Sequence, residues 1–391
     1  MKNKEELKQS PMLYLSAGSK ELFHSNFLYW IGKTNRGLFE RIINEIDGKK
    51  MEWPTNWEIR REYKNTDICI VYNKETGKMV KNHPVTKEYA FLVLENKVKS
   101  LATKEQLLEY EEKFDGLFEN DCHRYILLSL AKDYAELSDI KNTRWQITHY
   151  DELSKAITMY ASKYANVYIN DYCKYIANLS KLVKSWKINE NTKHLQEHPD
   201  LKEMRINDLY EKLHYSQMVQ MLVAKLKDMD AALRENYGSN YKGCSPSVCC
   251  GISNFKIITS RKYGILQHIF ISSTLSHAIG LLDVKIKVSD DTCYVIQLQG
   301  NRYCHGIEKK GIYNEINNDN TLAEIPFLNF SESEKGIDNK MICHYGDNFV
   351  YNYQKVTDET IGELLNKIND DIIKVLGQLF IKIQHEGNQN P

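Results

Sequence analysis

The sequence lacks the features that would assign it at once to several large classes of protein. Its 391 residues contain no long uncharged apolar run, and the mean hydropathy is −0.53. Both properties argue against a membrane-spanning segment. The sequence also has no Walker A motif, no G-x-S-x-G and no H-E-x-x-H. Without a phosphate-binding P-loop, the chain has no ATP-driven motor of its own.

Excess charge is absent too, because 52 basic and 52 acidic residues give a formal net charge of zero. Bulk charge therefore does not attract nucleic acid, and any contact with DNA or RNA must rely on local patches. The nine cysteines are an odd number, which favours free thiols over a disulfide framework. Residues 1 to 10 are charged and lack an apolar stretch, so we expect no signal peptide and a cytoplasmic protein.

The most informative stretch runs from Phe91 to Lys97. Four apolar residues, Phe91 to Leu94, predict a buried strand that ends in charge at Glu95 and Lys97. Residues two apart in a strand point to the same face of the sheet, so these two charges are neighbours. For an isolated E-x-K sequence, an ion pair at the strand end is the plain interpretation.

A second apolar run precedes this strand and begins with an acidic residue. Asp67 opens a β-branched run that ends at Tyr72, and a turn-forming stretch from 73 to 87 returns the chain to the Glu95 strand. As antiparallel neighbours, the two runs would bring both carboxylates to one side. Paired carboxylates suit Mg²⁺ or Mn²⁺, and a lysine beside them can orient or help deprotonate a water and offset charge on a phosphate. This combination is typical of phosphodiester hydrolysis.

These residues resemble the PD-(D/E)xK nuclease superfamily, in its bacterial restriction-endonuclease-like branch. Asp67, Glu95 and Lys97 match the motif, with Asn96 as the x, and Thr66 stands where the motif has proline. The resemblance covers roughly residues 15 to 155. It implies an α/β (α+β) fold with a core of mixed β-sheet flanked by helices.

Two flanking elements extend the resemblance. The stretch from Ser19 to Trp30 looks like the first helix of that branch, in which a glutamate, here Glu21, precedes the core. Gln106 and Tyr110 match a Q-x-x-x-Y element that follows E-x-K in several of these nucleases. Two alternatives stay open. Glu21 can be an ordinary first-turn residue favoured by the helix dipole, and Gln106 can complete a capping box with Thr103.

The resemblance implies a role for each matching residue. Asp67 and Glu95 would hold one or two Mg²⁺ (or Mn²⁺) ions, with the Asn96 carbonyl as a further ligand. Lys97 would position the attacking water, and Glu21 would reach a metal through water. The predicted catalytic residues are Asp67, Glu95, Lys97, Glu21 and Gln106, and the predicted substrate-binding residues are Tyr110, Lys113 and Arg61. A cross-strand ion pair is an alternative use for Arg61.

We expect three parts along the chain: a nuclease core at 1–155, a helical region at 156–237 and a β-rich region at 238–391 that ends in a helix. Apolar residues three to four apart predict the helical region, and a change to glycine, serine and cysteine precedes the β-rich part. The broad apolar face of the last helix would pack on the body or on a second copy, as in a homodimer.

The predicted function is that of a metal-dependent endonuclease without membrane contact, with DNA favoured over RNA as substrate and bacterial defence against foreign DNA as a plausible role. The alternative is a nucleic-acid-binding or partner-sensing module that keeps the nuclease fold but is inactive or needs a trigger.

Overall fold

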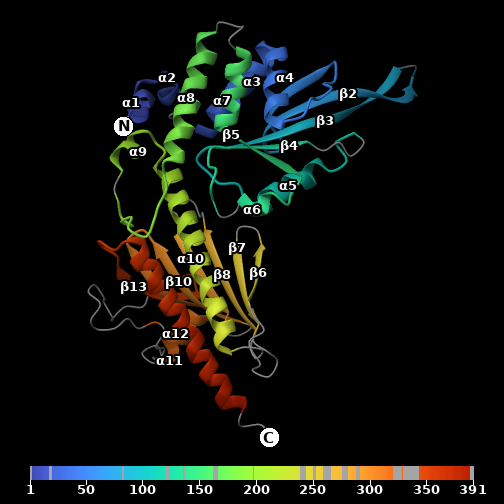
Figure 1. The fold of residues 1–391 in the computed structure, drawn as a ribbon. Coiled ribbons are helices and arrows are strands. Elements are labelled where there is room, and N and C mark those ends of the chain that lie inside the picture. The colour runs from blue at the N-terminus through green and yellow to red at the C-terminus, as the bar shows by residue number, and fades with distance from the viewer. Residues whose placement is uncertain are drawn as a thin grey trace. The chain divides into compact units, whose positions relative to one another are not determined.

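The chain divides into two compact units in the computed structural model. The first unit comprises Met1–Trp186 and His198–Tyr210, and the second comprises Lys187–Glu197 and Glu211–Pro391. Each contains one β-sheet, so the fold is mixed α/β, as predicted (Figure 1). The structure describes residues 2–16, 20–81, 83–119, 124–134, 137–161, 166–196, 198–237, 244–249, 252–258, 266–274, 281–287, 291–319, 328 and 343–387. Among the helices within these ranges, none is both long and apolar enough to span a membrane.

The first unit begins with four helices and three successive strands, and helices and strands alternate only from residue 104 to residue 149. Its elements are α1 (Lys2–Gln9), α2 (Pro11–Leu15), α3 (Lys20–Thr34), α4 (Arg36–Asp47), β1 (Trp57–Tyr63), β2 (Thr66–Val80), β3 (His83–Lys97), α5 (Lys104–Phe114), β4 (Tyr125–Ser129), α6 (Leu137–Ile140), β5 (Trp145–His149), α7 (Tyr150–Ala161), α8 (Val167–Lys184) and α9 (Pro199–Glu203). The long helix α10 (Asn207–Tyr237) begins with residues of the first unit and continues in the second. The predicted helical region 156–237 therefore contributes to both units.

The sheet of the first unit has the strand order β1-β2-β3-β4-β5. The first three strands are antiparallel, whereas β3, β4 and β5 run parallel to one another. A parallel neighbour requires a crossover connection, and α5 lies in the one between β3 and β4. All five residues of β4 are buried, as expected for a strand inside a sheet covered on both faces. The carboxyl end of β3 therefore lies next to a fully buried strand, with Lys97 paired with Ser129.

The stretch from 73 to 87 returns the chain to the Glu95 strand, as predicted, but the prediction that it forms a turn is wrong, because most of it is strand. Both strands continue through it, from the pair Asn73 and Glu88 to the pair Val80 and His83. The signal at Thr76-Gly77 produces a register shift between Glu75 and Met79, with Gly77 at φ +73°, and not the reversal of the chain. Residues 76–78 of β2 stand opposite Val85 alone, so β2 carries two extra residues here. Such a β-bulge, with glycine in the left-handed region, bends a hairpin without ending it.

Helix α3 covers part of this sheet and carries the predicted Glu21. Its residues Leu28 and Ile31 are fully buried, and Gly32 lies so close to Ile59 of β1 that an added Cβ would be 2.8 Å from the Ile59 side chain. Such a close approach favours glycine. The following helix, α4, begins with a cap in which the Asn35 side chain accepts a hydrogen bond from Leu38 N.

The second unit contains an antiparallel sheet with the order β12-β13-β11-β10-β9-β8-β7-β6. Its elements are β6 (Cys244–Cys249), β7 (Ile252–Ile258), β8 (Leu266–Thr274), β9 (Leu281–Lys287), β10 (Thr292–Gln299), β11 (Arg302–Lys309), α11 (Ile312–Asp319), β12 (Cys343–Tyr345), β13 (Phe349–Lys355) and α12 (Ile361–Gly387). The expected β-rich region with a final helix is thus present.

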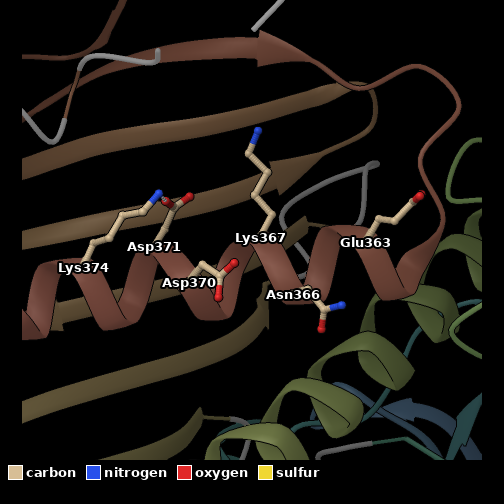
Figure 2. Close-up of a pocket in the computed structure, with 6 residues that line it drawn as sticks. All are labelled: Glu363, Asn366, Lys367, Asp370, Asp371 and Lys374. Atoms are coloured by element: carbon tan, nitrogen blue, oxygen red, sulfur yellow. Dashed lines mark hydrogen bonds and ion pairs between the residues drawn. The ribbon is translucent and has the colours of Figure 1, made fainter. Parts of the chain in front are cut away.

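A buried carboxylate joins α12 to this sheet. Asp371 accepts hydrogen bonds from Tyr303 Oη at 2.6 Å and His305 Nε2 at 3.0 Å, both on β11, and from Lys374 Nζ at 3.2 Å. Figure 2 shows Asp371 and Lys374 close together on α12, whereas Asp370 points away from them. The side chains that line the groove here all come from this one helix and point in different directions, so they do not converge on a ligand (Figure 2).

Replacing this carboxylate should destabilise the second unit. Asp371→Ala leaves the buried Tyr303 and His305 without their shared acceptor, and removing one partner of a buried charged network costs about 3 kcal/mol. Urea unfolding followed by circular dichroism should show this loss, whereas the exposed neighbour Asp370→Ala should match wild type. All five tryptophans belong to the first unit, so their fluorescence serves as an internal reference.

The same loss should depend on pH. Burial alone would raise the pKa of Asp371, but the hydrogen bonds and charge of His305, with those of Tyr303 and Lys374, hold it at about 2. The stabilisation is therefore complete above pH ~4, the range of an unfolded aspartate, and is lost as pH falls through 2. The gap between wild type and Asp371→Ala should shrink as the pH is lowered from 4 to 2. A constant gap would contradict this assignment.

Candidate functional site

The antiparallel pairing of β2 with β3 brings the two predicted carboxylates together. Ile68 is paired with Leu94, so Asp67 and Glu95 are opposite each other at the next position along the two strands. The backbone N–H of Asp67 points to Glu95 Oε2 at 3.4 Å. Residues opposite each other on neighbouring strands share a face of the sheet. The predicted pairing of the two runs is therefore confirmed.

Glu95 and Lys97 form the ion pair expected from their spacing. Lys97 Nζ lies 2.8 Å from Glu95 Oε1, and the two residues are only 7% and 4% exposed. Tyr110 Oη lies 3.5 Å from the same oxygen, and Gln106 Nε2 donates to Tyr110 Oη at 3.0 Å. The site thus continues from the strand end onto α5, through two of the residues predicted to follow the E-x-K sequence.

The charge state of Lys97 decides what it can do. Burial alone would lower its pKa, but the charge of Glu95 and the hydrogen bond to it, with Glu21 nearby, raise the pKa above its ordinary value. Lys97 is therefore a cation at neutral pH. It can hold a water or a phosphate oxygen by charge and by donation of hydrogen bonds, but it is a poor general base in this state.

The surroundings of Asp67, unlike those of Lys97, disfavour the charged form of the side chain. Burial, followed by repulsion from Glu95, raises its pKa to about 7, although hydrogen bonds from Asn96 N at 2.7 Å and Ser25 Oγ at 3.0 Å favour the charged form. Two carboxylates close together and only one lysine leave the pair with uncompensated negative charge. A divalent cation would relieve this repulsion.

The donor set fits a hard cation of the Mg²⁺ type. Within the ranges described above, no three His, Cys, Asp or Glu side chains are grouped so that they could hold a metal ion. A cation here would have only the two carboxylates of Asp67 and Glu95 as side-chain ligands, with backbone carbonyl and water to complete its shell. Mg²⁺ is commonly held by one or two carboxylates and keeps several waters, whereas a structural zinc site needs four protein ligands.

Glu21 contacts the loop that follows Lys97. Its Oε1 accepts hydrogen bonds from the backbone N–H groups of Val98, Lys99 and Ser100 at 3.3, 3.1 and 2.9 Å, and from Ser100 Oγ at 2.5 Å. Burial would raise its pKa, but the Ser100 hydrogen bonds and the Lys97 charge lower it. Glu21 thus fixes the chain directly after the E-x-K sequence, and it is charged.

Ser25 and Tyr150 take part in the site although the sequence analysis assigned them no role. Asn96 Nδ2 donates to the Glu21 carbonyl at 3.0 Å and to Ser25 Oγ at 3.3 Å, and Asn96 Oδ1 accepts a short hydrogen bond from Tyr150 Oη. Ser25 follows Glu21 by four positions, so helical spacing could have placed it on the same face. No sequence pattern around Tyr150 indicates its role, because it reaches the site from α7.

No family model, curated protein or solved structure matches the chain. The geometry of the site therefore carries the functional argument.

The two remaining predicted residues, Lys113 and Arg61, differ in how they are connected to the site. Lys113 forms an ion pair with Glu109 at 2.6 Å, and its Nζ lies 5.2 Å from the centre of the Tyr110 ring. Arg61 is exposed on β1 and lies over the Tyr29 ring. Lys113 is thus connected to the site through Tyr110, whereas Arg61 has a separate environment.

Of the capping box considered for Thr103 and Gln106, the structure contains only the hydrogen bond to Thr103. Thr103 Oγ1 accepts a hydrogen bond from Gln106 N at 3.3 Å, so Thr103 caps α5. The Gln106 side chain turns to Tyr110 instead of completing a capping box. It is therefore available to the site.

The raised pKa of Asp67 predicts a stability that falls with increasing pH. The folded protein keeps this proton up to about pH 7, whereas an unfolded aspartate loses it near pH 4. The stabilisation is thus complete below pH ~4 and is lost as pH rises through 7. In EDTA, Asp67→Asn should become progressively more stable than wild type over this range. The gain should reach about 1–2 kcal/mol at pH 8, since solvent screens part of the repulsion.

Asp151→Asn provides a control of opposite sign. Burial would raise the pKa of Asp151, but Lys132 and Lys184 hold it at about 2, so its loss should destabilise the protein at pH 8. Thermal unfolding of both variants between pH 4.5 and 8 checks the pair of expectations. An Asp67→Asn variant that is less stable than wild type at pH 8 would show that Asp67 is not repelled by Glu95.

Proposed function

We propose that the first unit is a metal-dependent nuclease that hydrolyses phosphodiester bonds, with DNA as the favoured substrate. The observation that carries the proposal is the opposition of Asp67 and Glu95 on neighbouring strands, with the Lys97 ammonium 2.8 Å from Glu95. The order α3, antiparallel β1-β2-β3, α5 and a β4 parallel to β3 is the core order of the PD-(D/E)xK nucleases that the sequence resembles. A role in defence against foreign DNA would follow from that resemblance.

Asp67, Glu95 and the Asn96 carbonyl would hold Mg²⁺ or Mn²⁺. When bound, such an ion polarises the phosphate and lowers the pKa of a coordinated water. The hydrogen bonds from Ser25 Oγ and Asn96 N orient the Asp67 carboxylate. Fixed orientation of this kind lowers the entropic cost of placing phosphate and water in line.

Lys97 would act on the charge that builds up as the phosphodiester is attacked. Its ammonium stays protonated and is fixed by Glu95, so it can donate to the attacking water or to a phosphate oxygen without rearrangement. Glu21 keeps the following loop, and with it the end of β3, in place. Gln106 and Tyr110 would steady the scissile region from α5.

The burial of the site favours a second candidate, an enzyme that needs a trigger. Glu95, Asn96 and Lys97 are 4%, 1% and 7% exposed. Asp67 is half-buried, whereas the three E-x-K residues are almost fully covered, so contact of a nucleic acid with Glu95 or Lys97 would need a rearrangement that opens the site. In this version, binding of a partner or ligand would expose a complete set of catalytic residues.

Cleavage assays test the proposal. We expect the full chain to cut plasmid or linear duplex DNA with Mg²⁺ or Mn²⁺ and to be inactive in EDTA. Asp67→Asn and Lys97→Met should lower the rate at least 100-fold, because each removes charge needed in the transition state. Single-stranded DNA and tRNA in the same panel identify the substrate.

Asp151→Asn is the matched control, since it removes a carboxylate that pairs with two lysines of the same unit outside the site. It should keep wild-type activity if it remains folded by circular dichroism. Cleavage that survives both site substitutions would refute the assignment. Absence of cleavage, together with Mn²⁺ binding by wild type but not by Asp67→Asn, would support the triggered enzyme.

A further inference from the structure

The hairpin of β2 and β3 extends well beyond the sheet. Pairing of β1 with β2 ends at Tyr72, and pairing of β3 with β4 begins at Val93. The part between them, which we call the arm, consists of Asn73–Lys81 and His83–Glu88 and forms a two-stranded ribbon (Figure 1). All its residues except Val85 and Glu88 are exposed. The core of the first unit therefore does not need the arm.

The outer part of the arm carries charge of one sign, whereas its base also contains Glu75 and Glu88. From Gly77 to Lys87 the sequence contains Lys78, Lys81 and Lys87 and no acidic residue. The whole chain is neutral, so this is a local basic element of the kind that nucleic-acid binding by a neutral protein requires. Two apolar side chains near the tip, Met79 and Val80, are 63% and 60% exposed.

The base of the arm is held in a fixed position. The rings of Tyr72 and Tyr89 stack with their centres 5.8 Å apart, and Tyr72 Oη donates to Glu119 at 2.5 Å. Lys74 pairs with the same glutamate, and Lys87 lies over the Tyr89 ring at 4.8 Å. Arg60 of β1 also pairs with Glu88 on the β3 side, so contacts with Glu119 and Arg60 tie both strands to the body and orient the arm before any partner binds.

We propose that the arm binds double-stranded DNA by entering its major groove. That groove is about 12 Å wide and admits a two-stranded β-ribbon, and the lysines on the arm would neutralise the phosphates beside it. The inference rests on the proposed nuclease function for its purpose and adds to it the substrate class, a duplex in place of a single strand.

The distance along the hairpin sets the length of duplex. Val80 follows Asp67 by thirteen positions in β2, which spans at most ~43 Å at ~3.3 Å per residue. A duplex rises ~3.4 Å per base pair, so at most about a dozen base pairs separate the carboxylates from the tip. A duplex of 30 base pairs is therefore long enough to contact both.

Fluorescence anisotropy with labelled 30-base-pair and 8-base-pair duplexes and a single-stranded 30-mer, in EDTA, tests the inference. The variant Lys78→Gln/Lys81→Gln/Lys87→Gln should bind the long duplex at least tenfold more weakly, with a salt dependence reduced by about two phosphate contacts. Its binding of the short duplex, which can still reach the arm alone, should also weaken, whereas its binding of the single strand should be unchanged.

The control removes the same net charge from exposed lysines elsewhere in the first unit, as Lys49→Gln/Lys50→Gln/Lys155→Gln. It should bind the long duplex as wild type does. Equal losses in both triple variants, or competition by polyglutamate as strong as that by DNA of equal charge, would overturn the proposal. So would a wild type that binds no duplex, or an arm variant that differs only in self-association.

The two proposals fail separately. Duplex binding that depends on the arm lysines, without metal-dependent cleavage, would refute the proposed nuclease function and support the proposed role of the arm. If the arm variant binds and cleaves the long duplex as wild type does, the proposed role of the arm is refuted and the proposed nuclease function stands.

Discussion

The buried ion pair of Glu95 with Lys97 is the interaction on which the first unit depends. Both residues are more than nine-tenths buried, and burial of a charge is tolerated only when it is paired and hydrogen-bonded. Tyr110 beside Glu95 and the Glu21-bound loop after Lys97 supply that environment. Apolar residues of similar volume would often stabilise a fold as well as such a pair. Its presence at a strand end beside Asp67 is therefore better explained by chemistry than by stability.

The balance of charge leads to the same conclusion. Lys97 compensates Glu95, and backbone N–H groups compensate Glu21, but the hydrogen bonds from Ser25 and Asn96 do not offset the repulsion of Asp67 by Glu95. A network that only held strands together would have no reason to retain this repulsion, because it costs free energy. A divalent cation bound between Asp67 and Glu95 would replace their repulsion by attraction to the cation. Cost of this kind at one position, supported by well-packed surroundings, is characteristic of functional sites.

Sequence patterns were sufficient for the strands that carry the carboxylates and for their pairing. The continuous apolar runs before Glu95 and after Asp67 predict buried strands, and the period of two in any strand then sets which side chains share a face. Local signals failed at Thr76-Gly77, because glycine with a positive φ serves equally well in a turn and in a bulge. The roles of Ser25 and Tyr150 were out of reach for a different reason. They depend on where α3 and α7 pack, which no short stretch specifies.

One hairpin carries both the carboxylates and the arm, and this has a structural consequence. The separation between them is set by the continuous hydrogen bonds of β2 with β3 and by two register shifts, at Ile70/Val71 and Glu75/Met79. Bulges bend a ribbon and increase its twist. The direction of the arm relative to Asp67 and Glu95 is therefore determined within the hairpin itself. Charges on the arm are screened beyond about 8 Å at physiological salt, so they act on what the arm touches and not on the distant carboxylates. Docking and chemistry can thus be altered independently, although they share the same two strands.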